Sequence, residues 1–131
     1  MDKCNLSTLA AAFAAALMAS STNAQSFESL SETEAVGYCA TFYLAKKEHA
    51  GEDDLNGAIA AEATGFLAAA SLVADKPAEE LASDLSQAAG MMKNFFRLAG
   101  LSSDAQTMLD QSESFCRSIA PNYDATNELF Q

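Results

Sequence analysis

Two widely separated cysteines, Cys39 and Cys116, are the residues with the clearest capacity for chemistry in this chain. Catalytic dithiols usually stand close together, as in Cys-x-x-Cys at a helix start, where the helix dipole lowers the pKa of a thiol. Here most of the chain separates the two thiols, and neither lies at an expected helix start. The spacing therefore favours a structural disulfide over redox catalysis or metal binding.

The first 24 residues have the pattern of an export signal. A short polar start precedes a run of mostly Ala and Leu that is too short to span a bilayer core of about 30 Å. Thr22 and Ala24 supply the small residues that a signal peptidase requires just before its cleavage site. We therefore expect residues 1–24 to be removed. Residues 25–131 would then form one domain in the periplasm of a Gram-negative-type bacterium or outside the cell, where a disulfide can form.

His49 is the single histidine of the chain, and it stands among charged residues near an expected helix end. A hydrolase site needs a histidine beside a nucleophile, and a zinc site needs three or four ligands. Neither set can be assembled here, so we predict no catalytic residues, no metal site and no cofactor. Haem held without covalent attachment by His49 and a core methionine, Met92 or Met108, is kept as an alternative.

Acidic residues dominate the charge of the chain. There are 18 Asp and Glu against 7 Lys and Arg, giving a net charge of −11. Such a chain repels the phosphates of nucleic acids and the surface of an anionic membrane. No apolar run after the signal reaches membrane-spanning length. The expected partner is therefore another protein, and a basic surface on it would suit this charge.

The composition predicts an all-α fold, because strand-forming Val and Ile are scarce while Ala, Leu and Glu are abundant. Periodicity and capping residues predict four helices over about 32–48, 54–74, 77–99 and 104–120, with a tail over 121–131. The expected start and stop signals are Ser31 with Glu34, Gly51, Asp53 or Asp54, Pro77, and Ser103 with Gln106.

Each helix is expected to bury one apolar stripe. The stripe of the first helix consists of Val36, Cys39, Phe42, Tyr43 and Lys46, and that of the second of Leu55, Ile59, Ala63, Phe66, Leu67, Ala70 and Val73. Gly65 lies inside the second helix, where glycine is unfavourable by about 1 kcal/mol relative to alanine. Ala61, Gly65 and Ala69 are spaced by four and form a strip of small residues, which predicts that a neighbouring helix approaches closely there.

The short connections predict antiparallel neighbours and hence an up-down-up-down four-helix bundle. In such a bundle Cys39 and Cys116 fall near the same end of the first and last helices, each on its apolar stripe. A disulfide joining these two helices is therefore expected, provided that the two Cα atoms come within about 7 Å.

The third helix carries more apolar residues than one core face requires. Met91, Phe95 and Leu98 therefore form a candidate surface for a partner, since methionine and aromatic side chains suit adaptable binding. A candidate pocket for a small apolar ligand is formed by core residues of three helices, namely Phe66, Met92, Phe95, Met108 and Phe115.

These observations favour a non-enzymatic protein-interaction module over an enzyme, because no nucleophile and base can be paired. Two alternatives stay open. One is a carrier of a small apolar ligand or haem in the bundle core. The other is an acid-responsive periplasmic chaperone, because the carboxylates would lose their charge on acidification.

Overall fold

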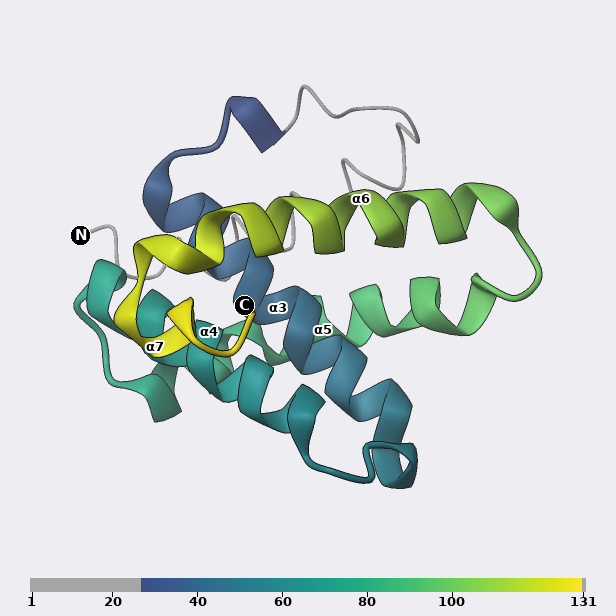
Figure 1. The fold of residues 1–131 in the computed structure, drawn as a ribbon, viewed down its shortest axis with the longest axis horizontal. Coiled ribbons are helices and arrows are strands. Elements are labelled where there is room, and N and C mark those ends of the chain that lie inside the picture. The colour runs from purple at the N-terminus through teal and green to yellow at the C-terminus, as the bar shows by residue number, and fades with distance from the viewer. Residues whose placement is uncertain (1–26, 131) are drawn as a thin grey trace.

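The computed structural model describes residues 27–130, which form an all-helical fold with four long helices (Figure 1). These helices are α3 Glu32–Ala50, α4 Ala58–Ala74, α5 Ala78–Leu98 and α6 Ser103–Ile119. The shorter elements are η2 Gly51–Asp53, η3 Ala120–Asn122 and α7 Asp124–Asn127. The prediction of an all-α fold is confirmed. The predicted export signal, residues 1–24, lies outside the described residues.

Helix α3 lies at the centre of the fold, runs diagonally in Figure 1 and packs most extensively against α4 and α5. Every residue from Ala35 to Tyr43 is buried, so the prediction of a single buried stripe is wrong for this helix. Small residues on its other sides, including Gly37 and Ala40, allow neighbouring elements to approach all round. A helix without a polar face is buried on every side.

The predicted ends of α3 are confirmed. The Ser31 N–H donates to Glu34 Oε1 at 2.9 Å, and the Glu34 N–H donates to Ser31 Oγ at 3.2 Å, which completes a capping box. At the other end Gly51 has φ of 52°, a left-handed conformation that glycine adopts without strain, and its N–H donates to the Lys47 carbonyl.

Helix α4 begins at Ala58, four residues later than predicted. Gly57 has φ of 66°, so the chain turns there before the helix starts. The Asp54 carboxylate still caps the helix from outside, because it accepts the N–H groups of Ile59 at 3.0 Å and Ala60 at 2.9 Å. As a consequence Leu55, predicted in the buried stripe, lies in the turn and is 88% exposed.

Helices α5 and α6 each bury one apolar face, as expected, although residues near the end of each face, such as Phe96 and Ile119, are half-buried. In α5 the fully buried members include Leu81, Leu85 and Met92. The cap of α6 is Ser102 rather than the predicted Ser103, because Ser102 Oγ accepts the Ala105 N–H at 3.2 Å. Both Ser102 and Ser103 have a hydroxyl that could accept this hydrogen bond. Ser102 is the cap because its backbone is extended, with φ of −137°, whereas Ser103 is already helical.

The helix directions depart from the predicted up-down-up-down order at one connection. The chain direction changes by 110° between α4 and α5, which is well short of a reversal. None of the described helices is by itself long and apolar enough to cross a membrane, although α4 and α5 taken together pass that test of length and composition.

The predicted disulfide is present and joins α3 to α6. Cys39 and Cys116 are fully buried, and their Cα atoms lie 5.6 Å apart. Figure 1 shows α6 crossing the central helix α3, and the disulfide joins the two helices. It closes a loop with a sequence separation of 77 residues, for which the chain-entropy model gives a stabilisation of about 4–5 kcal/mol.

The chain after α6 folds back onto α4. Buried Thr126 anchors this tail, because its hydroxyl donates to the Ala120 carbonyl at 2.7 Å. A Cβ built at Gly65 would lie 2.8 Å from the Ala125 carbonyl oxygen and 2.8 Å from Cδ1 of Leu129. The predicted close approach at Gly65 is thus confirmed, and the element that approaches is the short α7 with its following residues.

Candidate functional site

The outer side of α4 carries a shallow, open trough made of two hollows. The larger has a volume of about 530 Å³ and lies between α4 and the tail, lined by Gly57, Ala60, Ala61, Thr64, Gly65, Ala68, Ala125 and Leu129. The smaller, of about 390 Å³, is lined by Ala68, Ser71, Leu72, Asp75, Lys76 and Pro77. Both hollows include Ala68, so together they follow the helix from its first turn to its last. We call this surface the α4 trough.

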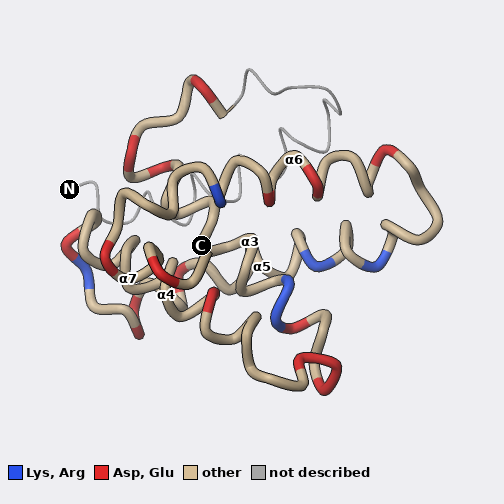
Figure 2. The backbone as a smooth tube through the Cα atoms, in the orientation of Figure 1, with Lys and Arg blue, Asp and Glu red and all other residues tan. Residues whose placement is uncertain are grey.

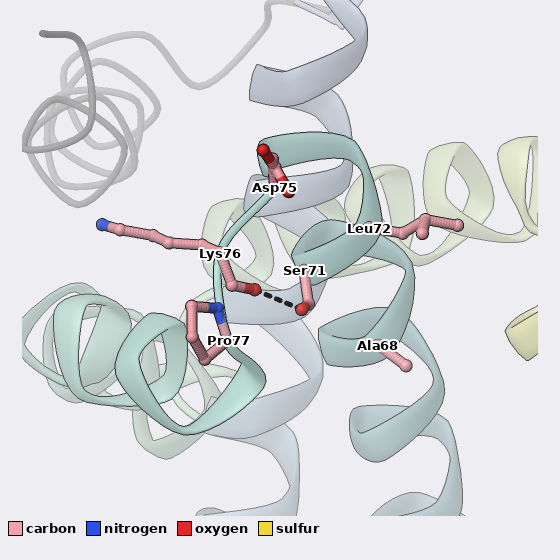
Figure 3. Close-up of a pocket in the computed structure, with 6 residues that line it drawn as sticks. All are labelled: Ala68, Ser71, Leu72, Asp75, Lys76 and Pro77. Carbon is pink, nitrogen blue, oxygen red and sulfur yellow. Dashed lines mark hydrogen bonds between the residues drawn. The ribbon is translucent and has the colours of Figure 1, made fainter.

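Figure 3 shows how the sequence shapes the far end of the trough. The Ser71 hydroxyl donates to the Lys76 carbonyl, and Asp75 takes a left-handed φ of 56°, so the helix ends in a tight turn. Leu72 projects from the helix and is 81% exposed. The Lys76 side chain extends away from Leu72, and its ammonium group pairs with Asp84.

No charged residue lines the trough between Gly57 and Leu72, and Asp75 and Lys76 line its far end. Helix α4 contains one charged residue, Glu62. Its side chain is half-buried, is influenced by the charges of Lys46 on α3 and Arg117 on α6, and is not among the residues that line the trough. The exposed positions of the helix between its ends are small or apolar: Ala58, Ala61, Thr64, Ala68 and Leu72. In a chain with a net charge of −11, such an uncharged face over about 25 Å of helix is a distinct surface.

Carboxylates surround this uncharged floor. Glu52 and Asp53 are exposed just before the trough, and Asp75 is exposed at its far end. Along its side, Asp124 and Glu128 are exposed next to the lining residues of the tail, and Figure 2 shows these acidic positions on the loop and on α7. The trough is therefore apolar at its centre and negative at its rim.

A second cluster joins α3, α4, α6 and the tail around the buried Tyr43. The Tyr43 ring stacks on Phe66 at 5.4 Å between centroids and meets Phe130 of the tail at 5.3 Å. The Lys46 ammonium lies 5.5 Å from the Tyr43 ring centre. The Tyr43 hydroxyl is buried without a hydrogen-bond partner, so this ring is held by packing rather than by polar contacts.

Glu113 is the ionic centre of this cluster. Its carboxylate accepts the Lys46 ammonium at 3.1 Å and Arg117 at 3.0 and 3.2 Å, which links α3 to α6. Burial alone would raise the pKa of Glu113, but the charges and hydrogen bonds of Lys46 and Arg117 outweigh it and the pKa lies below its ordinary value. Burial raises the pKa of Glu62, with Lys46 and Arg117 offsetting part of the effect.

This cluster lacks the features of an acid–base site. Burial raises the pKa of Tyr43 well above its ordinary value, so its hydroxyl stays protonated and cannot act as a base near neutral pH. Glu113 pairs with both cationic side chains of the cluster, Lys46 and Arg117. No serine or thiol is among the partners described. We assign it the structural role of holding the tail and α6 against α3.

The predicted surface on α5 is only partly exposed. Leu98 is 48% exposed, whereas Met91 and Phe95 are half-buried and Phe95 packs against the core. Leu101, in the turn after α5, is 86% exposed and extends this surface. It stays a predicted surface, smaller in its exposed apolar side chains than sequence periodicity suggests.

The predicted pocket residues all belong to one packed hydrophobic core or lie against it. Phe66 stacks on Tyr43 at 5.4 Å, and the half-buried Phe115 stacks on Phe27 at 4.6 Å. Met92 and Met108 are buried in the core, and Phe95 is half-buried. None of the five lines either hollow of the α4 trough.

His49 lies exposed at the end of α3, where its ring stacks on Phe96 at 5.8 Å. Met92 and Met108, the two methionines of the haem alternative, are buried in the core, whereas His49 is exposed. Within residues 27–130, no group of three His, Cys, Asp or Glu side chains is arranged to hold a metal ion.

Comparison with known proteins found no match to any family model, curated protein or solved structure. Function must therefore be argued from the site itself.

Sequence reasoning missed the α4 trough although a signal for it was present. Glu62 is the one charged residue between Ala58 and Ala74, so the outer side of α4 has no charged residue. A surface helix normally carries its polar residues on that side. The spacing of Ala61, Ala68 and Leu72 places these residues together on that side.

Proposed function

We propose that this protein is exported and acts outside the cytoplasm as a non-enzymatic module that binds another protein through the α4 trough. The pattern of residues 1–24 supports export to the periplasm or beyond. The disulfide between Cys39 and Cys116 supports the same location, because cytosolic thiols are usually kept reduced.

The observation that carries this proposal is the hollowed face of α4, whose exposed positions are uncharged and whose lining includes exposed leucines. Leu72 is 81% and Leu129 41% exposed, and each would lose contact with water on binding. Burying about 100 Å² of apolar surface contributes roughly 2.5 kcal/mol. A large exposed apolar patch with a polar rim is typical of an interaction site.

The α4 trough is favoured over the predicted α5 surface because it is hollowed as well as exposed. A carrier role has less support, because the predicted pocket residues pack in or against the hydrophobic core and none of them lines either hollow of the α4 trough. An enzymatic role has less support still, because the described residues bring together no nucleophile and base.

Photo-crosslinking in the cells that naturally make the protein tests this proposal. A benzophenone amino acid replaces Leu72 in the trough or, as a matched exposed control, Ser86 on α5. We expect a discrete crosslinked product from position 72 that is absent from position 86. Products that are absent from both positions, or equal at both, would contradict the proposal.

An acid-responsive role is a second candidate, favoured by the Glu113 bridge. Protonation of Glu113 would remove the ionic partner that Lys46 and Arg117 share. Besides core packing, the disulfide and the buried Tyr38–Ser112 hydrogen bond would then remain between α3 and α6. Binding of a hydrophobic dye near pH 2–3 together with loss of the near-UV CD signal would support this role. An unchanged near-UV spectrum without dye binding would remove it.

A further inference from the structure

The floor of the α4 trough suits a helix better than an extended strand. The residues that line its larger hollow are mostly Gly and Ala, which let another helix approach to about 8 Å between axes. The exposed edge of a sheet is what an extended peptide needs for pairing, and residues 27–130 contain no strand. The trough follows α4 for about 25 Å, which matches a partner helix of four to five turns.

Exposed acidic residues near both ends of the trough determine which charge a bound helix should carry at its own ends. Glu52 and Asp53 precede the trough in the chain and Asp75 lines its far end, all three exposed. The nearest basic side chain is Lys76. Its Nζ already pairs with the Asp84 carboxylate and lies 3.9 Å from Glu80 Oε2. A helix that ended in acidic residues would be repelled at either end, whereas Lys or Arg there would be attracted.

We propose that the α4 trough receives an amphipathic helix of the partner, with an apolar face that lies on Ala61, Ala68 and Leu72 and with Lys or Arg at both ends. This inference rests on the proposed function, since it names the kind of partner that the same surface binds. A second copy of this chain fits less well, because antiparallel or parallel self-docking of α4 brings acidic ends onto acidic ends.

Fluorescence anisotropy with three labelled 18-residue peptides tests the inference on the full domain with its disulfide intact. The first peptide has a Leu/Ala face and two Lys at each end. The second has the same face with Glu at the ends, and the third has the Lys ends but Ser in place of each Leu. We expect the first to bind at least about tenfold more tightly than either other peptide, and to weaken as salt rises.

Protein variants locate the binding. Ala68→Glu puts a charge in the middle of the trough at an exposed position, so folding should persist, and Ser86→Glu is the control on α5. We expect Ala68→Glu to weaken the first peptide about tenfold or more and Ser86→Glu to leave it within about twofold. Unchanged thermal unfolding of both variants verifies that the fold is kept.

Several outcomes overturn the inference. Equal binding of the three peptides, no binding of the first, or no effect of Ala68→Glu would each do so. A dimer in sedimentation velocity that Ala68→Glu dissociates would instead assign the trough to a second copy. If position 72 crosslinks a partner in cells while the peptides show no preference, the inference fails and the proposed function stands. If position 72 gives no specific product, the proposed function itself fails.

Discussion

The packing of the tail on Gly65 can be tested by comparing two glycine substitutions within long helices. At Gly90, in α5, a new Cβ would meet no atom within 4 Å. Gly90→Ala should therefore stabilise the protein by about 0.5–1 kcal/mol, the usual gain in helix propensity. At Gly65 the same substitution gives the same gain in propensity, but the methyl group would lie 2.8 Å from the backbone oxygen of Ala125.

The difference between the two variants isolates the cost of the clash. Crowding of a packed site by one methyl group is unfavourable by about 1–3 kcal/mol. A backbone atom cannot move out of the way alone, so α7 has to shift with it. We expect Gly65→Ala to be about 1–3 kcal/mol less stable than Gly90→Ala, which for a domain of this size corresponds to a lower Tm by several degrees, roughly 4–8 °C per kcal/mol.

Urea denaturation measures both free energies of unfolding, and hydrogen exchange locates the effect. In Gly65→Ala we expect faster exchange at the amides of residues 123–130, with α5 unchanged. If Gly65→Ala stabilises the protein as much as Gly90→Ala does, the tail does not rest on α4 as described. The reasoning from the Gly65 contacts would then be refuted.

Three further comparisons test the contacts around α3. Replacing both Cys39 and Cys116 by Ala should lower the free energy of unfolding by several kcal/mol, up to about 4–5, in urea titrations under oxidising conditions, and a loss below about 1 kcal/mol would contradict a bridge that restrains the unfolded chain. Tyr43→Phe removes a buried hydroxyl without a partner and should be neutral or stabilising by about 1 kcal/mol. Tyr38→Phe removes a hydroxyl 2.5 Å from Ser112 Oγ and should destabilise by about 1 kcal/mol, so the reverse order in thermal melts would argue against these assignments. Folding lowers the pKa of Glu113, so ionised Glu113 stabilises the folded protein above its unfolded pKa, and this stabilisation is lost as pH falls through the folded pKa. In Glu113→Gln the free energy of unfolding should therefore depend less on pH in the acid range. The pKa of Glu62 is raised, so its ionisation opposes folding as pH rises through that pKa; Glu62→Gln should be more stable than the parent chain at pH 7, and equal profiles for the two variants would contradict both assignments.

Local signals in the sequence predicted the parts of the fold that depend on neighbouring residues. The capping box of Ser31 and Glu34 and the stop at Gly51 involve residues close in sequence, and both are present. The disulfide was also predictable, because only Cys39 and Cys116 follow the expected signal.

Features set by contacts distant in sequence were not predictable from periodicity. The all-round burial of α3 depends on how three other helices surround it, and its many small residues give little indication of which sides are covered. The exposure of Leu55 follows from the left-handed turn at Gly57, which delays the start of α4. The 110° turn before α5 is a tertiary property that the connection length alone does not fix.

The candidate site shows the same division. Met91, Phe95 and Leu98 were chosen because they exceed the needs of one core face, yet two of the three are half-buried. The α4 trough was missed because Ala60, Ala61 and Ala68 lie outside the predicted apolar stripe of this helix, and the pattern of hydrophobicity does not indicate a binding role for small residues there. The tail that forms one wall of the trough reaches α4 across a sequence distance of about 60 residues, since Ala125 contacts Gly65.

The central claim is that the partner binds to α4 rather than to α5. The most direct test is titration calorimetry of the partner identified by crosslinking, with the parent domain, Leu72→Glu and Leu98→Glu. Both substitutions put a carboxylate at an exposed leucine, so they are matched in chemistry. We predict that Leu72→Glu raises the Kd about tenfold or more, which is a loss of at least about 1.4 kcal/mol of binding free energy. The Kd of Leu98→Glu should stay within about twofold of the parent value. Loss of binding in Leu98→Glu with full affinity in Leu72→Glu would contradict the claim.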